Sequence, residues 1–189
     1  MDNFESKEYA NMDFTSIALI KGEYEDCQFT NCNFEGSHLS QFNFIECQFS
    51  NCNLSNIKVD HTAFRDIQFE NCKMLGIDFS VCNTFLLEFQ FNNCQLNFAS
   101  FYQLKIKGTS FTHCNLEEVD FVQSTIEKGR VTDCNLLHAQ FDNSILEQTD
   151  FSNSVNFAID PDRNYMNGAK FSQDGLLGLL TKHNIKITD

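Results

Sequence analysis

A seven-residue motif returns along almost the whole chain. It reads QFTNCNF at 28–34 and recurs as QFSNCNL (48–54), QFENCKM (68–74), QFNNCQL (90–96), SFTHCNL (110–116) and RVTDCNL (130–136). The copies are 20 residues apart, except for one step of 22. Self-similarity at such a spacing is typical of a solenoid, in which each repeat packs only on its neighbours. We therefore expect one domain of stacked, nearly identical coils.

A finer period of five runs inside each motif. One large apolar residue recurs per pentad from Phe4 to Phe79, and again from Phe91 to Phe151. A small or medium-sized residue lies two positions before it, and every cysteine falls in the register of that slot, although Cys82 precedes Thr84 at the end of the first series. The cysteines are Cys27, Cys32, Cys47, Cys52, Cys72, Cys82, Cys94, Cys114 and Cys134.

A period of five fits neither regular secondary structure. On an α-helix five residues advance about 500°, which would scatter the apolar positions around the cylinder. On a strand, an odd step sends alternate large residues to opposite faces of the sheet. We therefore expect the chain to bend at each pentad, so that four bends close a square coil and residues 20 apart stack at about 4.8 Å.

The periodicity resembles the pentapeptide repeat, Ala-(Asp/Asn)-Leu-x-x, here as Cys-(Asn/Gln/Lys)-(Leu/Phe/Met), over about residues 4–157. The resemblance implies an all-β solenoid over 1–157, a right-handed quadrilateral β-helix of about eight coils with the large and small residues of each pentad inside. At about 4.8 Å per coil the rod would be about 38 Å long. Residues 158–189 would add a C-terminal turn, a helical cap and a short strand.

The cysteines are interpreted as buried filler, in preference to a disulfide or redox role or a metal site. Six of them recur once per coil, as a small buried hydrophobe would. An odd number of thiols in a chain that we expect to be intracellular disfavours disulfides. A zinc site would need closer pairs and a convergent partner. We predict no metal and no cofactor.

No catalytic constellation is visible. The histidines are scattered, and His113 takes the slot that Asn31, Asn51 and Asn71 occupy in other repeats. Asn suits an exposed corner because it tolerates turn geometry and hydrogen-bonds to nearby backbone, so this column is interpreted as structural. The sequence shows no Gly-rich phosphate loop and no G-x-S-x-G motif. We expect no catalytic residue and no enzyme activity.

Neither a leader pattern nor an apolar run long enough to cross a bilayer is visible, so we expect a cytoplasmic protein without a membrane partner. The 26 acidic and 13 basic side chains give a formal net charge of −13. This charge disfavours direct binding to nucleic acid and favours a basic partner. B-DNA carries roughly 22 charges over about 38 Å, so the rod allows a partial imitation of DNA. An acidic surface that only keeps the rod soluble is the alternative.

Within the family, the chain resembles the topoisomerase-protecting group that includes AlbG, McbG, Qnr and MfpA. The resemblance rests on FENCKMLGI (69–77) and on the ending, with VNFAID at 155–160, a turn at 161–164, AKFS at 169–172 and then a leucine-rich segment. It implies an acidic dimer that binds DNA gyrase or topoisomerase IV as an imitation of duplex DNA and protects it from quinolones or a gyrase-targeting toxin. The alternative is an acidic interaction scaffold with another partner.

The periodicity gains two residues between Phe79 and Phe91, and this jog covers residues 84–90. It is a candidate contact point, and the alternative is a bulge whose apolar side chains cover the defect. The candidate contact residues of the jog are Phe85, Leu86, Leu87 and Glu88. Further candidates are acidic residues at outward or corner slots, expected to steer the rod into a basic DNA-binding surface. They are Glu25, Asp26, Glu46, Asp66, Glu70, Glu117, Glu118, Asp133 and Asp142.

The segment 158–189 combines helix signals with excess apolar surface. Ser172 is the expected N-cap, Asp174 lies in the first turn and Asn184 marks the stop. Residues 185–187 alternate like a short strand. An open β-helix end must be covered, and the resemblance implies end-to-end homodimerisation, with a purely intramolecular cap as the alternative. The residues expected at the dimer contact are Phe171, Leu176, Leu177, Leu179 and Leu180.

Overall fold

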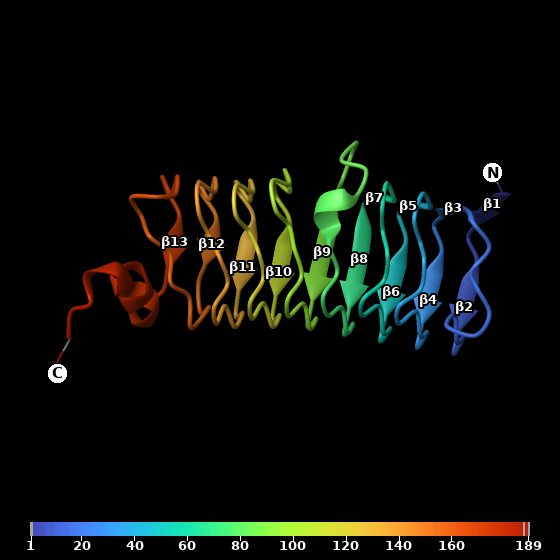
Figure 1. Ribbon diagram of the computed structural model, residues 1–189, viewed down its shortest axis with the longest axis horizontal. Helices are drawn as coiled ribbons and strands as arrows, with labels where there is room; N and C mark the ends of the chain where they lie inside the picture. Colours follow the sequence, from blue (N-terminus) through green and yellow to red (C-terminus); the bar gives the residue numbers. More distant parts are fainter. Residues whose placement is uncertain (1, 187, 189) are drawn as a thin grey trace.

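The computed structural model describes residues 2–186 and 188. The chain forms a straight rod of stacked coils, with the N-terminus at one end and a helical segment beyond the last coil at the other (Figure 1). The prediction of a quadrilateral β-helix of about eight coils is confirmed. Among the described residues, no helix is both long and apolar enough to cross a membrane.

Two parallel sheets form two sides of the rod. The four-stranded sheet contains β1 (Asp2–Glu5), β3 (Gly22–Glu25), β5 (Asn43–Ile45) and β7 (Ala63–Arg65). The nine-stranded sheet contains β2 (Glu8–Ala10), β4 (Gln28–Thr30), β6 (Gln48–Ser50), β8 (Ile67–Glu70), β9 (Phe89–Asn92), β10 (Ser110–Thr112), β11 (Arg130–Thr132), β12 (Asp150–Phe151) and β13 (Lys170–Phe171).

The remaining sides are joined by single bridges such as Asn33↔Asn53 and Asp78↔Ser100. Strand partners are 20 residues apart, but β8 and β9 pair with an offset of 22, as in Gln68↔Gln90. The two extra residues of the jog are therefore absorbed before β9 begins, and the nine-stranded side continues without a change of register. A short 3₁₀ turn, η1 (Phe79–Val81), precedes the jog.

A left-handed residue forms the corner of most pentads. Asn31, Asn51 and Asn71 have φ of 55°, 55° and 54°, and the same conformation recurs at intervals of five residues. The chain changes direction at these points, which meets the requirement for a bend at each pentad. The Asn93 amide also donates to Oδ1 of Asn71 at 2.7 Å. This contact between coils supports the structural interpretation of the Asn column.

The interior is filled by vertical files of aromatic rings. Phe69 and Phe91 stack with centroids 5.2 Å apart, and Phe91 and Phe111 stack at 4.9 Å. A second file on another side contains Phe79 and Phe101, at 4.9 Å. Residues of successive coils thus meet ring on ring across the jog as well as elsewhere.

The small slot of the pentad often holds a buried hydrogen-bond donor. All nine cysteines are buried and form no disulfide. The Cys72 thiol donates to the Phe49 carbonyl at 3.3 Å, and the Thr149 hydroxyl donates to the Ile126 carbonyl at 2.8 Å in an equivalent position of another coil. The prediction that the cysteines are buried in the interior is confirmed. The donor role was not predicted, and it explains why Ser and Thr take this slot in other coils.

The segment after the last coil forms 3₁₀ turns, η2 (Gln173–Leu179) and η3 (Thr181–His183). Ser172 stands at the predicted N-cap position, but its side chain does not cap the helix. Its hydroxyl oxygen instead accepts a hydrogen bond from the Asn153 backbone N–H at 2.6 Å. Two glycines within η2 disfavour a longer α-helix because Gly has a low helix propensity.

The end of the chain agrees with the prediction at Asn184 but not at the residues that follow it. Asn184 follows η3 in a left-handed conformation, with φ of 49°, at the predicted stop. Ile185 and Lys186 lie in no strand, and Ile187, the third residue of the expected strand, lies outside the described residues.

Truncation of a ring in the file of Phe69, Phe91 and Phe111 should destabilise the rod strongly. Phe91→Ala removes a fully buried ring from the stack, and large-to-small changes of this kind cost about 3–5 kcal/mol. Phe85→Ala is the matched control, since Phe85 is 64% exposed, and should change the free energy of unfolding by less than about 0.5 kcal/mol. Urea denaturation followed by circular dichroism measures both, and similar losses for the two variants would contradict the file.

The thiols should be inert in the folded protein. Burial raises the pKa of the Cys47 thiol to about 12 and raises that of Cys82 as well, and the thiolate is the reactive form. We expect almost no labelling by a thiol reagent at pH 8 and reaction of nine thiols in denaturant. Rapid labelling of the native protein would show that the small slots open to solvent.

Candidate partner interface

The jog forms a loop that projects from the side of the rod (Figure 1). The Phe85 N–H donates to Oδ1 of Asn83 at 2.9 Å, which starts the turn, and Leu86 has φ of 56°. The Glu88 N–H then donates to the Phe64 carbonyl at 3.2 Å and returns the chain to the stack. The loop therefore displays Phe85 and Leu86 at its tip, 64% and 66% exposed.

Where the loop leaves the stack, this side of the rod lacks one inward-pointing side chain, and the side chains of Phe89 and Leu87 fill the space. Phe89 is fully buried, with its centroid 5.6 Å from that of Phe64 and 5.1 Å from that of Phe79. Leu87 is partly buried and packs against the core. The proposed covering of the defect thus holds for Leu87 but not for Phe85 and Leu86, whose side chains face solvent.

Arg65 lies beside the loop. Its guanidinium carbon is 5.6 Å from the centre of the Phe85 ring, within the range of a cation–π contact. The contact orients Phe85 without burying it.

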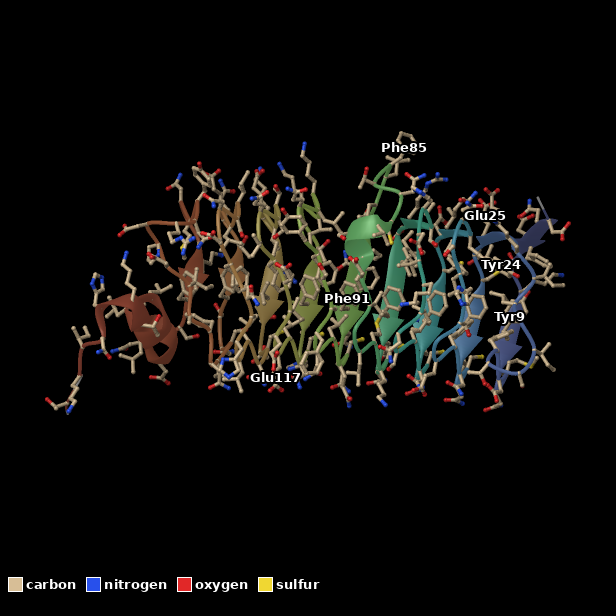
Figure 2. All side chains as sticks on the ribbon, in the orientation of Figure 1. Tyr9, Tyr24, Glu25, Phe85, Phe91 and Glu117 are labelled. Carbon is tan, nitrogen blue, oxygen red and sulfur yellow. The ribbon has the colours of Figure 1, made fainter. Side chains whose placement is uncertain are left out.

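Five of the predicted acidic residues come together on one edge, next to the loop. We call Glu25, Asp26, Glu46, Asp66 and Glu88 the acidic edge. Backbone hydrogen bonds align these residues from coil to coil. The Asp26 N–H donates to the Ile45 carbonyl, next to Glu46, and the Glu46 N–H donates to the Arg65 carbonyl, next to Asp66. The Ile67 N–H, next to Asp66, donates to the Glu88 carbonyl. Successive coils therefore present one of these carboxylates every 4.8 Å or so. Glu25 and Phe85 lie along the same upper border of the rod in Figure 2.

The other predicted acidic residues lie elsewhere. Glu70 stands at the end of β8, on the nine-stranded side. Glu117 accepts a hydrogen bond from Asn97 at 3.1 Å, and it lies along the opposite border from Glu25 in Figure 2. Asp142 is paired with Arg163 at 2.7 Å.

Glu118 and Asp133 occupy two other corner columns. The Glu118 N–H bonds to the Leu137 carbonyl, and the Asp133 N–H bonds to the Ser152 carbonyl. Asp133 continues the column of His113 and the Asn corners. The periodicity of the sequence thus indicates which carboxylates point outward, but it does not show which of them lie on the same side of the rod.

The acidic edge ends at the jog. Its corner column continues with Gly108 and then Lys128. Both Lys128 and Lys107 lie within 3.7 Å of Glu127, whose pKa is lowered chiefly by the hydrogen bond from Lys107. Residues 1–88 carry 14 acidic and 5 basic side chains, hence −9, whereas residues 89–189 carry 12 and 8, hence −4. The acidic surface is therefore concentrated in the N-terminal half.

The predicted dimer residues divide into two groups. Phe171 and Leu179 are partly buried and pack against the core, where Phe171 stacks on Phe151 at 5.0 Å. Leu176, Leu177 and Leu180 are exposed. The first pair closes the end of the rod, and the second group leaves an apolar surface on the cap.

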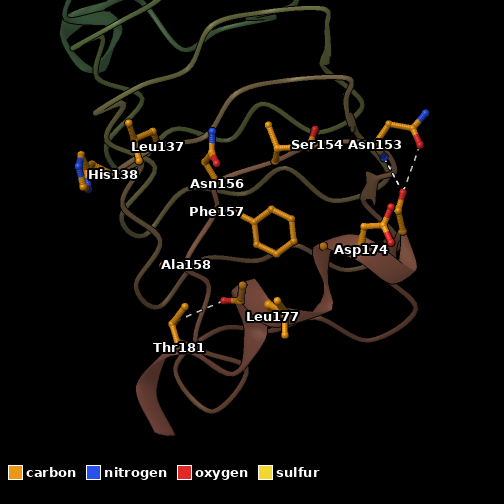
Figure 3. A pocket seen from close by; sticks show the side chains of 14 residues that line it. Leu137, His138, Asn153, Ser154, Asn156, Phe157, Ala158, Asp174, Leu177 and Thr181 are labelled. Atoms are coloured by element: carbon orange, nitrogen blue, oxygen red, sulfur yellow. Dashed lines mark hydrogen bonds between the residues drawn. The ribbon is translucent and has the colours of Figure 1, made fainter. Parts of the chain in front are cut away.

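A groove of roughly 760 Å³ separates the last coil from η2. Figure 3 shows the ring of Phe157 at its centre, with Leu137 on the coil side and Leu177 on the η2 side. The backbone approaches closely at Gly178, where an added Cβ would collide with the Phe157 carbonyl oxygen. Lys182 ties the cap to the preceding turn by pairing with Asp160, at 2.7 Å, and with Asp162.

Sequence reasoning missed two exposed aromatic residues, Phe98 and Tyr102, which are 58% and 38% exposed. Phe98 occupies a corner slot that holds Gly76 and Glu118 in the neighbouring coils. This break in the corner pattern is the signal that could have identified it. Among the described residues, no group of three His, Cys, Asp or Glu side chains is placed to hold a metal ion.

Comparisons with known proteins identify the fold. A family model described as a pentapeptide repeat region matches residues 22–90 and 86–155. Curated protein sequences give no significant match. Among solved structures, full-length QnrB1, described as a plasmid-mediated fluoroquinolone resistance protein, has a TM-score of 0.59 at 18% identity, over 97% of this chain and 100% of that one. A trypsin-treated, singly substituted form of QnrB1 has a TM-score of 0.61 at 18% identity, over 100% and 92%.

Removing the Lys182 charge should loosen the cap. The pKa of Asp160 is lowered chiefly by the hydrogen bond from Lys182, so this pairing stabilises the cap above the ordinary aspartate pKa of about 3.9 and is lost as the pH falls through the lowered folded value. In Lys182→Met we expect faster amide hydrogen exchange over residues 175–184 at pH 7, and the wild type should approach it in acid after correction for intrinsic rates. Lys186→Met, another exposed lysine of this segment, is the control. Equal exchange in Lys182→Met and wild type would contradict the clamp.

Proposed function

The chain belongs to the pentapeptide repeat family, and on this premise we propose that it is a non-enzymatic cytoplasmic protein that binds DNA gyrase or topoisomerase IV by imitating duplex DNA. The observation that carries the proposal is the acidic edge beside the exposed loop tip. The edge presents carboxylates in successive coils, whereas one strand of B-DNA places a phosphate every 3.4 Å or so. The coil spacing of about 4.8 Å and this phosphate spacing are close enough for several cations of a DNA-binding surface to pair with carboxylates of the edge.

The similarity to QnrB1 supports this direction. The description of QnrB1 as a fluoroquinolone resistance protein suggests protection of the topoisomerase from quinolones. Protection from a peptide toxin that targets gyrase would use the same contact. In either case the protein would act by occupying or reshaping the DNA-binding surface, which needs no catalytic residue.

Binding would begin with electrostatic steering. A carboxylate-lined edge attracts a basic surface over about a Debye length, 8 Å at physiological salt. The apolar tip at Phe85 and Leu86 would then enter a pocket on the enzyme, since a few well-packed, desolvated residues carry most of the affinity of a typical protein interface.

We further propose a homodimer through the cap. Leu176, Leu177 and Leu180 give the C-terminal end an exposed apolar surface, and pairing of two such ends would bury it. Two rods end to end would be about 75 Å long and would carry a charge of −26, twice the value of one chain. A two-fold object of this kind matches the symmetry of a dimeric enzyme.

Purified DNA gyrase provides the direct test. We expect the protein to bind gyrase, to inhibit supercoiling at high concentration and to reduce cleavage-complex formation by a quinolone at lower concentration. Absence of binding, inhibition and protection at low salt would overturn the proposal and favour an acidic scaffold with another partner.

Two charge variants with equal net charge should separate the acidic edge from general acidity. The edge variant carries Asp26→Asn, Glu46→Gln, Asp66→Asn and Glu88→Gln. The control carries Glu117→Gln, Glu118→Gln, Asp133→Asn and Asp142→Asn, so that both change the net charge from −13 to −9. The edge variant should bind gyrase at least tenfold more weakly with a smaller salt dependence, whereas the control should change affinity by less than about threefold. Equal effects would assign the steering to net charge alone.

The dimer has its own test. Replacement of Leu176, Leu177 and Leu180 by Ser removes the exposed apolar surface but leaves Phe171 and Leu179 in the core contact. We expect the wild type to sediment as a dimer and the triple variant as a monomer with an unchanged circular dichroism spectrum. A wild-type monomer at micromolar concentration would show that the cap is only intramolecular.

A further inference from the structure

Two corners of the rod are occupied by large apolar residues. Among the described residues with positive φ, Leu86 and Phe98 are the only hydrophobic ones, with φ of 56° and 64°. A bulky side chain in the left-handed region is strained, whereas Asn and Gly adopt it readily. Gly76 takes the position of Phe98 in the preceding coil. Neither apolar side chain gains burial in return, since both are mostly exposed.

The strained residues belong to one band of exposed apolar side chains in the middle of the rod. We call this band, Phe98, Tyr102, Val81, Phe85 and Leu86, the apolar belt. Each member is at least 38% exposed.

The belt crosses two adjacent sides of the rod. Phe98 is a corner, and Tyr102 lies on the side that follows it. The bridge Asp78↔Ser100 places Tyr102 one coil beyond Ser80, next to Val81 at the following corner. The chain then turns onto the side that carries the loop with Phe85 and Leu86. A flat partner surface cannot contact both ends of such a belt, so a matching surface must reach around a corner.

Carboxylates flank the belt on two sides of the rod. Lys105 and Lys107 also lie near it, in the coil beyond the loop, where Lys107 is paired with Glu127. Asp78 and Asp120 bridge to Ser100 from the coils on either side of it and so lie next to the side that holds Tyr102. Asp66 and Glu88 of the acidic edge flank the loop. Arg65 is close, but it is engaged with the Phe85 ring. An apolar surface bordered by carboxylates repels phosphates of nucleic acids and anionic lipids and suits a protein surface with apolar pockets among cationic side chains.

We infer that the apolar belt is a corner-gripping contact surface for the basic partner protein, with Phe98 and Tyr102 forming a second contact beside the loop tip. The inference rests on the proposed function, which makes the partner a type II topoisomerase. It adds that the enzyme contacts two adjacent sides of the rod at the same level. The strain at Leu86 and Phe98 persists because the exposed apolar side chains serve binding.

The inference predicts that stability and binding change in opposite directions. Phe98→Asn relieves the backbone strain and should raise Tm by about 2 °C or more. It also removes an exposed aromatic anchor and should weaken binding to purified DNA gyrase at least tenfold. Leu86→Asn should behave in the same way, and Tyr102→Ser should weaken binding with little change in Tm. Scanning calorimetry and biolayer interferometry on the full chain measure the two quantities.

Two controls accompany these variants. Phe98→Tyr retains the ring and should retain binding without a gain in Tm. Ile17→Ser removes another exposed apolar side chain, 66% exposed and far from the belt, and should leave binding unchanged.

The outcomes distinguish this inference from the proposed function. A higher Tm and weaker binding of Phe98→Asn support the belt. If wild type binds gyrase but Phe98→Asn binds equally well, or if its Tm falls, the belt is wrong and the proposed function stands. If wild type does not bind gyrase, the proposed function fails and the inference falls with it.

Discussion

The left-handed corner is the constraint on which the rest of the structure depends. One residue in most pentads turns the chain. Because of this, the large and the small residue between two corners point inward, and residues in the next coil repeat that arrangement directly above them. Backbone hydrogen bonds such as that from the Asn51 N–H to the Glu70 carbonyl then join one coil to the next. The aromatic files and the buried thiols follow from this geometry, since each inward position always has the same neighbours. The exposed side chains are held in columns for the same reason, which allows a carboxylate repeated at one slot to become a charged edge.

The jog shows how such a repetitive structure accommodates an irregularity. Two extra residues could have displaced every later coil by a fraction of a turn, but β9 pairs with β8 in the expected way and the file from Phe69 to Phe111 is continuous. The regular packing is interrupted on one side alone, where the chain loops out and Phe89 fills the space. A loop that is anchored at both ends and backed by Arg65 is well placed to hold Phe85 and Leu86 in a fixed orientation, which lowers the entropy lost on binding.

Much of the fold could be predicted from the sequence because the repeat makes each local prediction hold many times. The period of five identified the inward positions, and the steps of 20 and 22 identified the pairing register. The donor role of the cysteines was harder to foresee, because it depends on the distance from Sγ to a carbonyl one coil away. The missing side-chain cap at Ser172 was also hard to foresee, because the hydroxyl is engaged by the Asn153 N–H, a contact between segments 19 residues apart. The candidate site was predicted only in part, since outward slots can be recognised from periodicity, whereas their assignment to sides requires the corners to be counted through an irregular jog.

The distribution of charge limits how the rod can imitate DNA. A duplex is equally charged along its length, but the acidic edge ends at the jog, beyond which its corner column holds Gly108 and then Lys128, which is paired with Glu127. A basic surface that follows the edge would therefore be attracted strongly up to the loop and only weakly beyond it. In the proposed complex, the position of the partner along the rod would be set by this decrease in negative charge together with the apolar side chains at the boundary. In that complex, charge would provide the attraction, and the loop, at the point where the acidic edge ends, would fix the register. An imitation of this kind, confined to part of the rod, would also leave the capped end available for the proposed self-association, because the cap lies at the opposite end of the rod from the acidic edge.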